Sequence, residues 1–229
     1  MAGPRPEIDF WGRSPYHFPM LTRLLSLNPE CLEPEKYGRI IQVLAEGGVM
    51  VYPTDTFYGL GADCFSAPAL RRIYELKRRD PAKPLLVVIS DVDMAGLVAV
   101  DIPSVFLELA SEFWPGPLTL VLRAAASLPR ELLGEGESIA LRLPDLNWLR
   151  ALIRQAGFPL VATSANISGE KEISAPEDVL DSFHGKVDII VDGGRTAGVK
   201  PSTVLDLTAG KPRLVREGAV SMEKLGKYL

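Results

Sequence analysis

The segment between residues 71 and 83 concentrates positive charge. Its six cations are Arg71, Arg72, Lys77, Arg78, Arg79 and Lys83, against the two carboxylates of Glu75 and Asp80. A solvated helix face would also explain such a cluster. Two features favour an anion site instead: Lys77 and Arg79 are alternate residues at a predicted helix end, and Lys83 leads through Pro84 into an apolar segment. We predict that Lys77, Arg79 and Lys83 converge on a polyanion, whereas Arg71 and Arg72 face solvent.

Two further segments carry small hydroxyl side chains directly after apolar runs. Residues 52–56 (YPTDT) precede a glycine-rich turn at 58–61 (YGLG), and residues 163–166 (TSAN) lead into a glycine-containing loop. Each could be a tight loop held by its own Thr, Ser or Asp side chains. Each could also present hydroxyl and N–H groups at the carboxyl end of a strand, where α/β sheets bind ligands.

The common nucleotide and metal fingerprints are absent from the sequence. Residues 193–200 (GGRTAGVK) place the lysine one position too late for a P-loop, and no Ser or Thr follows it. Residues 59–61 lack the third glycine of a dinucleotide loop, and the Ser-x-x-Lys spacing of residues 168–171 is short enough to arise by chance. No metal site is predicted, because no ligand spacing connects the two cysteines and two histidines, Cys31, Cys64, His17 and His184.

Short apolar runs alternate with helical patterns along the chain. Helices are predicted from Pro34 up to Gly47 and Gly48, from Ser66 and Pro68 through Leu76, and over residues 104–113, 146–155 and 176–183. Strands are predicted over residues 49–52, 85–89, 118–122, 139–143, 160–163, 187–191, 203–207 and 214–216. This mixture predicts an α/β sheet with helices packed on it, and the short strand-to-strand steps late in the chain predict an antiparallel part.

Composition bounds the class of protein. The 229 residues are 47% hydrophobic and 24% charged, which is typical of a globular domain. The net charge of −4 argues against a protein that coats nucleic acid, so an anion site must be a local cluster. No apolar run approaches the roughly 18 residues of a membrane span, and the N-terminus lacks a signal core. We expect a cytoplasmic protein without a membrane partner, and two lone thiols fit a reducing compartment.

Residues 1–33 differ from the rest of the chain. Four prolines, at positions 4, 6, 15 and 19, argue against regular structure, yet Phe10, Trp11, Tyr16 and Phe18 are too aromatic for an ordinary free tail. We predict an irregular N-terminal arm over 1–33 that docks on a domain spanning 34–229; a disordered tail is the alternative.

Seven motifs occur in a fixed order along the chain. They are residues 52–61 (YPTDTFYGLG), 76–85 (LKRRDPAKPL), 113–119 (FWPGPLT), 140–144 (ALRLP), 163–169 (TSANISG), 201–206 (PSTVLD) and 215–219 (VREGA). In this order they resemble the threonylcarbamoyl-AMP synthase family, the YrdC-like domain, over about residues 35–222. We expect the single-domain form, without the C-terminal regulatory domain of longer relatives.

The resemblance implies a fold and an activity. The fold would be a twisted, open, mixed α/β sheet with flanking helices and a deep basic cavity. The enzyme would condense L-threonine, bicarbonate and ATP, with Mg²⁺, into threonylcarbamoyl-adenylate and pyrophosphate. A separate tRNA threonylcarbamoyl transferase would then modify adenosine 37 of tRNA. The resemblance therefore also implies tRNA or double-stranded RNA as a partner to be tested.

The resemblance also implies roles for individual residues, carried over by motif position. The catalytic set would be Lys77, Arg79, Ser164 and Asn166. The threonine-binding set would be Thr56, Arg142, Ser164 and Ser202, with Arg142 clamping the carboxylate. The ATP-binding set would be Arg79, Lys83, Ser138, Asn166, Ser174 and Arg216. The chain departs from the family at Val88, where many relatives carry His, and at Asp80, where a proline is usual.

Two other functions compete with the synthase. A basic cavity could accept double-stranded RNA, which would make binding steeply salt-dependent; the acidic net charge argues against it. A related domain also handles carbamoyl-adenylate in hydrogenase maturation, but it normally comes with acylphosphatase and zinc-finger segments that 229 residues do not accommodate.

Overall fold

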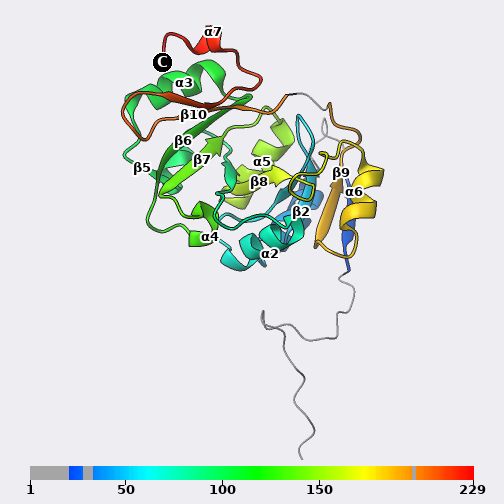
Figure 1. The fold of residues 1–229 in the computed structure, drawn as a ribbon. Coiled ribbons are helices and arrows are strands. Elements are labelled where there is room, and N and C mark those ends of the chain that lie inside the picture. The colour runs from blue at the N-terminus through cyan, green and yellow to red at the C-terminus, as the bar shows by residue number, and fades with distance from the viewer. Residues whose placement is uncertain (1–20, 28–32, 198–199) are drawn as a thin grey trace, which may run out of the picture.

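The computed structural model describes residues 21–27, 33–197 and 200–229 (Figure 1). Within these residues eleven strands form one mixed sheet in the order β1-β9-β2-β3-β8-β4-β7-β6-β10-β11, with β5 paired to β6. The strands are β1 Arg23–Ser26, β2 Met50–Pro53, β3 Tyr58–Gly61, β4 Leu86–Val88, β5 Ala99–Val100, β6 Leu118–Ala124, β7 Ser138–Arg142, β8 Leu160–Ser164, β9 Ile189–Asp192, β10 Thr203–Asp206 and β11 Arg213–Arg216.

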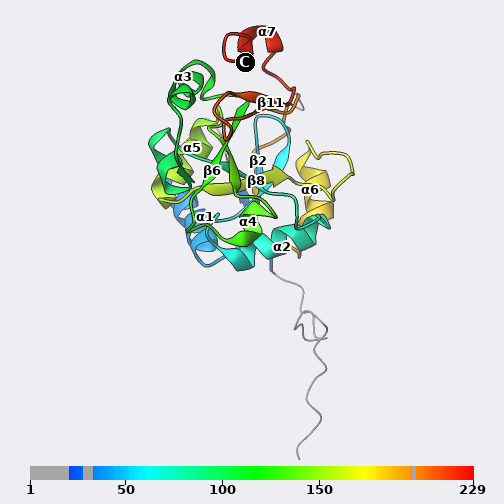
Figure 2. The same ribbon diagram turned by 60° about the vertical axis from the view of Figure 1, so that its left-hand side comes forward.

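Seven α-helices flank this sheet in the described part of the chain. They are α1 Pro34–Ala45, α2 Ala67–Lys77, α3 Ser104–Phe113, α4 Arg130–Leu133, α5 Asn147–Ala156, α6 Pro176–Phe183 and α7 Met222–Leu225. A 3₁₀ helix at Asp93–Leu97 lies between β4 and β5. The predicted α/β class with a mixed sheet and flanking helices is confirmed. Figures 1 and 2 show α2 and α6 on a different side of the molecule from α3 and α7.

Alternation along the strands divides the core between the two faces of the sheet. On β2, Met50 and Tyr52 join a cluster with Trp148 and Leu152 of α5 and with the apolar residues of α1. Their neighbour Val51 joins the other cluster, which includes Ile73 of α2 and the apolar residues of α3. Successive side chains of a strand point to opposite faces, so a short run of apolar residues supports both layers at once.

The predicted antiparallel part is present but extends further than the C-terminal strands. Strand β10 pairs antiparallel with β11, as expected, and parallel with β6. The segment at 58–61, interpreted from its glycines as a turn, is instead β3, which is fully buried and pairs antiparallel with β2 and β8. The prediction failed here because packing against two neighbouring strands outweighs the low strand propensity of glycine.

The N-terminal arm is not wholly irregular. Residues Arg23–Ser26 form β1, which runs parallel to β9 at one edge of the sheet. The hydroxyl of Thr22 donates to Val187 O (2.7 Å) and accepts from the Gly185 N–H (2.8 Å). All four prolines behind the prediction precede residue 20, whereas Leu25 and Leu27 can be buried against the body. Residues 1–20 and 28–32, and with them most of the predicted arm, lie outside the described part.

Candidate active site

A cavity of about 340 Å³ opens between β2, β3, β4, β7 and β8. Its walls combine apolar side chains with three arginines and two carboxylates. The charged residues are Arg79, Arg142, Arg216, Asp55 and Glu172. The hydroxyl residues Thr54, Thr56, Thr163, Ser164 and Ser202 also line it, whereas Leu86, Val88, Ala140, Leu149 and Ala162 supply apolar surface. This small cavity can therefore bind an anionic molecule that also carries aliphatic and hydroxyl groups.

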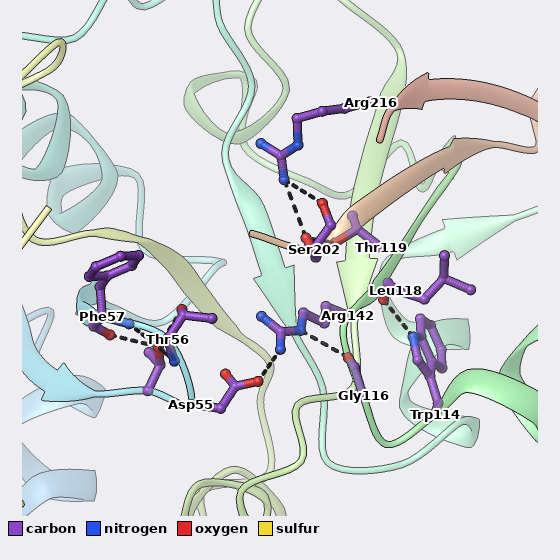
Figure 3. A network of polar contacts seen from close by, with 11 residues as sticks. Asp55, Thr56, Phe57, Trp114, Gly116, Leu118, Thr119, Arg142, Ser202 and Arg216 are labelled. Atoms are coloured by element: carbon purple, nitrogen blue, oxygen red, sulfur yellow. Dashed lines mark hydrogen bonds and ion pairs between the residues drawn. The ribbon is translucent and has the colours of Figure 1, made fainter. Parts of the chain in front are cut away.

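Arg142 lies at the end of β7 and is held by two fixed partners (Figure 3). Its Nε donates to the carbonyl of Gly116 (3.0 Å), and its Nη2 donates to the carboxylate of Asp55. A guanidinium has five N–H donors in a planar fork, so these contacts orient the group and leave donors for a ligand. The other carboxylate oxygen of Asp55 is buried and has no hydrogen-bond partner among residues 21–27, 33–197 and 200–229. Asp55 was missed by the sequence analysis, although a mostly buried arginine generally requires such a counter-charge.

The loop that carries Asp55 is ordered by Thr54. The Thr54 hydroxyl donates to Phe57 O (2.6 Å) and accepts from the backbone N–H groups of Thr56 (3.1 Å) and Phe57 (3.2 Å). The tight-loop interpretation of this segment is confirmed. Thr54 and Thr56 also border the cavity, and their use in ligand binding stays a prediction. Thr56 Oγ1 lies 3.0 Å from Thr54 Oγ1.

A second polar group comes from the C-terminal strands. Arg216 of β11 donates from Nη2 to Ser202 O (2.8 Å) and to Ser202 Oγ (3.3 Å). The Ser202 hydroxyl also lies 2.8 Å from the buried hydroxyl of Thr119 on β6. Figure 3 shows Arg216 and Ser202 on the same side of Arg142. Thr119 belongs to the FWPGPLT motif, which was the signal that could have identified it.

The end of α2 sends three successive cations in different directions. Arg78 adopts a left-handed conformation (φ 47°) and ends the helix, so Arg79 turns back and its N–H bonds to Tyr74 O (3.0 Å). Lys77 points inward and is only 1% exposed. Arg79 lines the small cavity, where its Nη2 donates to Pro84 O (2.9 Å). Its buried Nε has no hydrogen-bond partner within the described part of the chain.

Lys77 is enclosed by the turn that follows β8. Its ammonium donates to the carbonyl of Ser164, to the carbonyl of Asn166 (2.9 Å) and to Asn166 Oδ1 (3.1 Å). Burial, reinforced by Arg79 and opposed by Glu172, lowers the pKa of Lys77 from 10.5 to about 8. The Ser164 hydroxyl donates to Asn166 Oδ1 (2.6 Å), and Asn166 Nδ2 donates to Glu170 O (2.6 Å).

A larger cavity of about 1130 Å³ lies on the other side of this turn. Asn166, Ser174 and Arg78 line it, and Glu172 lines both cavities. Arg72 also borders it, and the prediction that Arg72 faces solvent is wrong. Its guanidinium forms a half-buried ion pair with Asp188 (2.8 Å), a partner that lies far along the chain and is brought close by β9. Arg71 is 56% exposed and pairs with Glu131.

The structure separates the sequence-predicted residues into three groups. Thr56, Arg79, Arg142, Ser164, Ser202 and Arg216 meet at the small cavity. Asn166 and Ser174 border the larger one. Lys77, Lys83 and Ser138 line neither, although Ser138 lies on the same face of β7 as Ala140 and Arg142. Lys83 is exposed, so its predicted convergence with Lys77 and Arg79 is not seen.

Comparison with known proteins identifies the family. A family model named for Sua5, YciO and YrdC and described as telomere recombination matches residues 42–218. The chain belongs to the Sua5/YciO/YrdC family. The threonylcarbamoyl-AMP synthase of Pyrococcus abyssi (strain GE5 / Orsay) is 38% identical over 186 residues, covering 81% of this chain and 55% of the relative. That of Bacillus subtilis (strain 168) is 38% identical over 185 residues, with 80% and 53% covered. The chain thus spans about half the length of these family members.

Solved structures of the family agree with this fold. The crystal structure of P. abyssi Sua5 complexed with L-threonine superposes with a TM-score of 0.85 at 36% identity, covering 91% of this chain and 61% of that one. Escherichia coli YciO gives a TM-score of 0.81 at 28% identity, covering 91% of this chain and all of YciO. The sequence-based prediction of the family is confirmed.

The described residues hold neither a candidate membrane span nor a candidate metal cluster. No helix there is long and apolar enough to cross a bilayer. No group of three or more His, Cys, Asp or Glu side chains in that part of the chain is arranged to hold a metal ion.

Proposed function

We propose that this chain is a threonylcarbamoyl-AMP synthase, which condenses L-threonine, bicarbonate and ATP to threonylcarbamoyl-adenylate and pyrophosphate. The observation that carries the proposal is the small cavity, where an oriented arginine, several hydroxyl groups and aliphatic side chains meet. These groups match the carboxylate, hydroxyl and methyl groups of threonine. Relatives named for this activity, and the related Sua5 complexed with L-threonine, support the assignment.

The proposed chemistry needs charge neutralisation and alignment rather than a protein nucleophile. The threonine amine and bicarbonate form a carbamate with loss of water. A carbamate oxygen then attacks the α-phosphorus of ATP, the bond to the β-phosphate breaks, and pyrophosphate leaves. Both reactants are anions, so the enzyme must hold two negative groups in line. Arg142 would bind the threonine carboxylate, with Thr56, Ser164 and Ser202 around the substrate, and Arg79 and Arg216 would bind phosphate oxygens.

The nucleotide requires more room than the small cavity offers. A volume of about 340 Å³ is at the lower end for small-molecule sites and fits an amino acid with an adjoining phosphate group. We propose that the nucleoside extends past Glu172 into the larger cavity, beside Asn166 and Ser174. Lys83 and Ser138 line neither cavity, so their place in the ATP set rests on motif position alone. Mg²⁺ would enter with ATP on its phosphate oxygens, because Mg²⁺ needs few protein carboxylates.

The proposed product determines the partners. Threonylcarbamoyl-adenylate is a reactive mixed anhydride, so a second enzyme would have to consume it. The family resemblance implies that this enzyme is a transferase that acts on tRNA. A direct tRNA contact belongs to the same proposal and would depend on local cationic surface, since the chain as a whole is acidic.

Pyrophosphate release from purified protein tests the function. We expect release only when ATP, bicarbonate and L-threonine are all present, with threonylcarbamoyl-adenylate detected by mass spectrometry. Omitting threonine is the matched control. Release that does not depend on threonine, or salt-sensitive binding of double-stranded RNA without release, would contradict the proposal and favour one of the two competing functions.

A further inference from the structure

Lys77 has no donor left for a ligand. An ammonium group has three N–H donors and no acceptor. Lys77 donates all three, to Ser164 O, Asn166 O and Asn166 Oδ1. The side chain is 1% exposed and lines neither cavity. We infer that Lys77 is a positioning residue that touches neither reactant but fixes which polar atoms Ser164 and Asn166 present to the two cavities. This inference rests on the proposed function for the identity of the ligands.

The ammonium decides the orientation of the Asn166 amide. An ammonium cannot accept a hydrogen bond, so the amide atom 3.1 Å from Lys77 Nζ must be the oxygen. The amide nitrogen therefore points to the other side, where it donates to Glu170 O (2.6 Å). One of its two N–H groups remains for a ligand. Because Asn166 borders the larger cavity, that group is a donor for phosphate or ribose oxygens.

The same contact fixes the polarity of Ser164. Its hydroxyl lies 2.6 Å from Asn166 Oδ1, which is a carbonyl-type oxygen without a proton, so the hydroxyl must donate. The Ser164 oxygen then faces the small cavity as an acceptor. An acceptor can bind the amine or hydroxyl of threonine but not its carboxylate. In the proposed function the carboxylate is bound by Arg142. The buried ammonium of Lys77 thus orients both side chains. The Asn166 amide offers an N–H donor to the nucleotide, and the Ser164 hydroxyl offers an acceptor oxygen to the amino acid.

A role as a direct phosphate ligand predicts different binding data. If Lys77 touched phosphate, its loss would weaken nucleotide binding alone. If Lys77 acts through the turn, its loss also weakens threonine binding, and its effect on nucleotide binding depends on Asn166. Because the ammonium would act through the Asn166 amide, removing that amide should remove most of the effect of removing Lys77.

The experiment measures equilibrium binding of α,β-methylene-ATP and, separately, of L-threonine by calorimetry. Lys77→Met and Asn166→Ala should each weaken the nucleotide analogue about 10–100-fold, and the double variant should be no more than about 3-fold weaker than either. Lys77→Met should also weaken threonine at least about 5-fold. Arg71→Met, which removes a cation from the exposed side of the same helix, should change both affinities less than about 2-fold.

Multiplicative losses in the double variant, or threonine affinity unchanged in Lys77→Met, would overturn the inference. If Lys77→Met does not fold, Lys77→Arg answers the question. A planar fork cannot meet three acceptors placed around one point, so we expect both affinities to fall, whereas retained nucleotide affinity would show that charge alone suffices. Asn166→Ala leaves the Lys77 charge in place, and undiminished nucleotide binding there would also overturn the inference. Failure of the unaltered protein to bind either probe would instead contradict the proposed function.

Discussion

Each of the three arginines of the small cavity uses only part of its guanidinium group for hydrogen bonds to the described protein residues. The other N–H groups are available to a ligand. Arg142 is held by Gly116 O and Asp55, and Arg216 by Ser202. Among the described residues, Arg79 is held by Pro84 O, and its buried Nε meets no hydrogen-bond partner there. An unpaired buried donor costs about 1–3 kcal/mol, so an anionic ligand that reaches this group recovers a contact that the free protein lacks.

Arg79 is the residue whose loss should most damage the proposed reaction. Arg79→Ala removes a donor at a site where charge shifts from the α-phosphate to pyrophosphate, so pyrophosphate release should fall roughly 10²–10³-fold. Arg79→Lys should recover little, because one ammonium does not reproduce a bidentate fork. The matched control is Arg71→Ala, whose exposed pair with Glu131 contributes at most about 1 kcal/mol. Equal losses in Arg79→Ala and Arg71→Ala, with circular dichroism showing both folded, would contradict this assignment.

The lowered pKa of Lys77 predicts a pH dependence for nucleotide binding. Because burial and Arg79 lower the pKa to about 8 against the opposing charge of Glu172, the ammonium is present below that pH and is lost as the pH rises through it. The neutral amine donates only two hydrogen bonds, so the turn loses one of the three that it accepts from Lys77 Nζ. Affinity for α,β-methylene-ATP should fall roughly 10-fold between about pH 7 and about pH 9.5. The Lys77→Met variant should lack this step; an identical fall in the variant would assign it to another group.

Among the elements, the loop from Ser164 to Ala175 separates the two cavities. Backbone hydrogen bonds connect this loop to β3 and α2. They include Tyr58 N to Ile173 O (2.8 Å), Ala165 N to Tyr58 O (2.7 Å) and Ser168 N to Lys77 O (2.8 Å). Residues 170–172 are exposed between these ties. A segment that is fixed at both ends and exposed in the middle can adjust to a ligand without disturbing the sheet.

Nucleotide binding should protect this loop from proteolysis. We expect saturating α,β-methylene-ATP to slow tryptic cleavage after Lys171 at least about 5-fold, because the ligand would order the open segment. Cleavage after Lys224, near the C-terminus and away from both cavities, serves as the internal control. If the analogue binds but the rate at Lys171 does not change, the loop does not close over the ligand.

The strand β11 depends on a glycine that follows it. A Cβ at Gly218 would lie 2.4 Å from Pro201 O and 2.6 Å from Ser202 O, so the chain could not pass this close to β10. Gly218→Ala should displace Arg216 from Ser202, lower pyrophosphate release and reduce the free energy of unfolding by about 1–3 kcal/mol. Gly38→Ala is the control, because nothing lies within 4 Å of a Cβ there; helix α1 should be stabilised by about 0.5–1 kcal/mol. Unchanged activity and stability in Gly218→Ala would show that the strand can shift freely.

At the scale of the whole molecule, the sheet joins segments from both ends of the chain. Strand β1 lies beside β9. At the other end of the chain, the Tyr228 hydroxyl donates to Glu112 of α3 (2.7 Å), and Figures 1 and 2 show the C-terminus near α3. The small cavity lies in the middle of this strand order, on β2, β3, β8, β4 and β7, whereas the larger cavity is lined by α2, α6 and the loop that follows β8. The outer strands therefore support the fold without bordering the small cavity, except for the β10–β11 end that supplies Ser202 and Arg216.

The tie between β1 and the sheet should affect stability but not ligand binding. Thr22→Val removes a buried hydroxyl and leaves the Val187 carbonyl and the Gly185 N–H without a partner. We expect the free energy of unfolding, measured with urea, to fall by about 1–3 kcal/mol. The affinity for L-threonine should stay within about 2-fold of the unaltered protein, because no residue of β1 borders either cavity. A large loss of threonine affinity in folded protein would indicate coupling across the sheet.

Local patterns in the sequence determined most of the elements. The helix predicted over 104–113 is α3 residue for residue. The helix predicted with Ser66 as its cap and Pro68 in its first turn is α2, which begins directly after Ser66 and carries the expected Leu76. The strand predicted over 139–143 is β7 within one residue at each end. Caps, prolines and apolar spacing act over a few positions, so they can be recognised without knowing what packs against them. The seven ordered motifs fixed the family for the same reason, since each is a short local string.

Partners far apart in the chain were decided by the tertiary structure. Arg72 carries the same charge as Arg71, and only the position of β9 places Asp188 against one of them. Lys77 and Arg79 looked equivalent in the sequence, yet the left-handed turn at Arg78 sends one into the body and the other into the small cavity. The acceptors of Lys77 lie 87 and 89 residues away. Whether a cation meets solvent, a carboxylate or a ring of carbonyl oxygens depends on long-range packing, which leaves no local signature in the sequence.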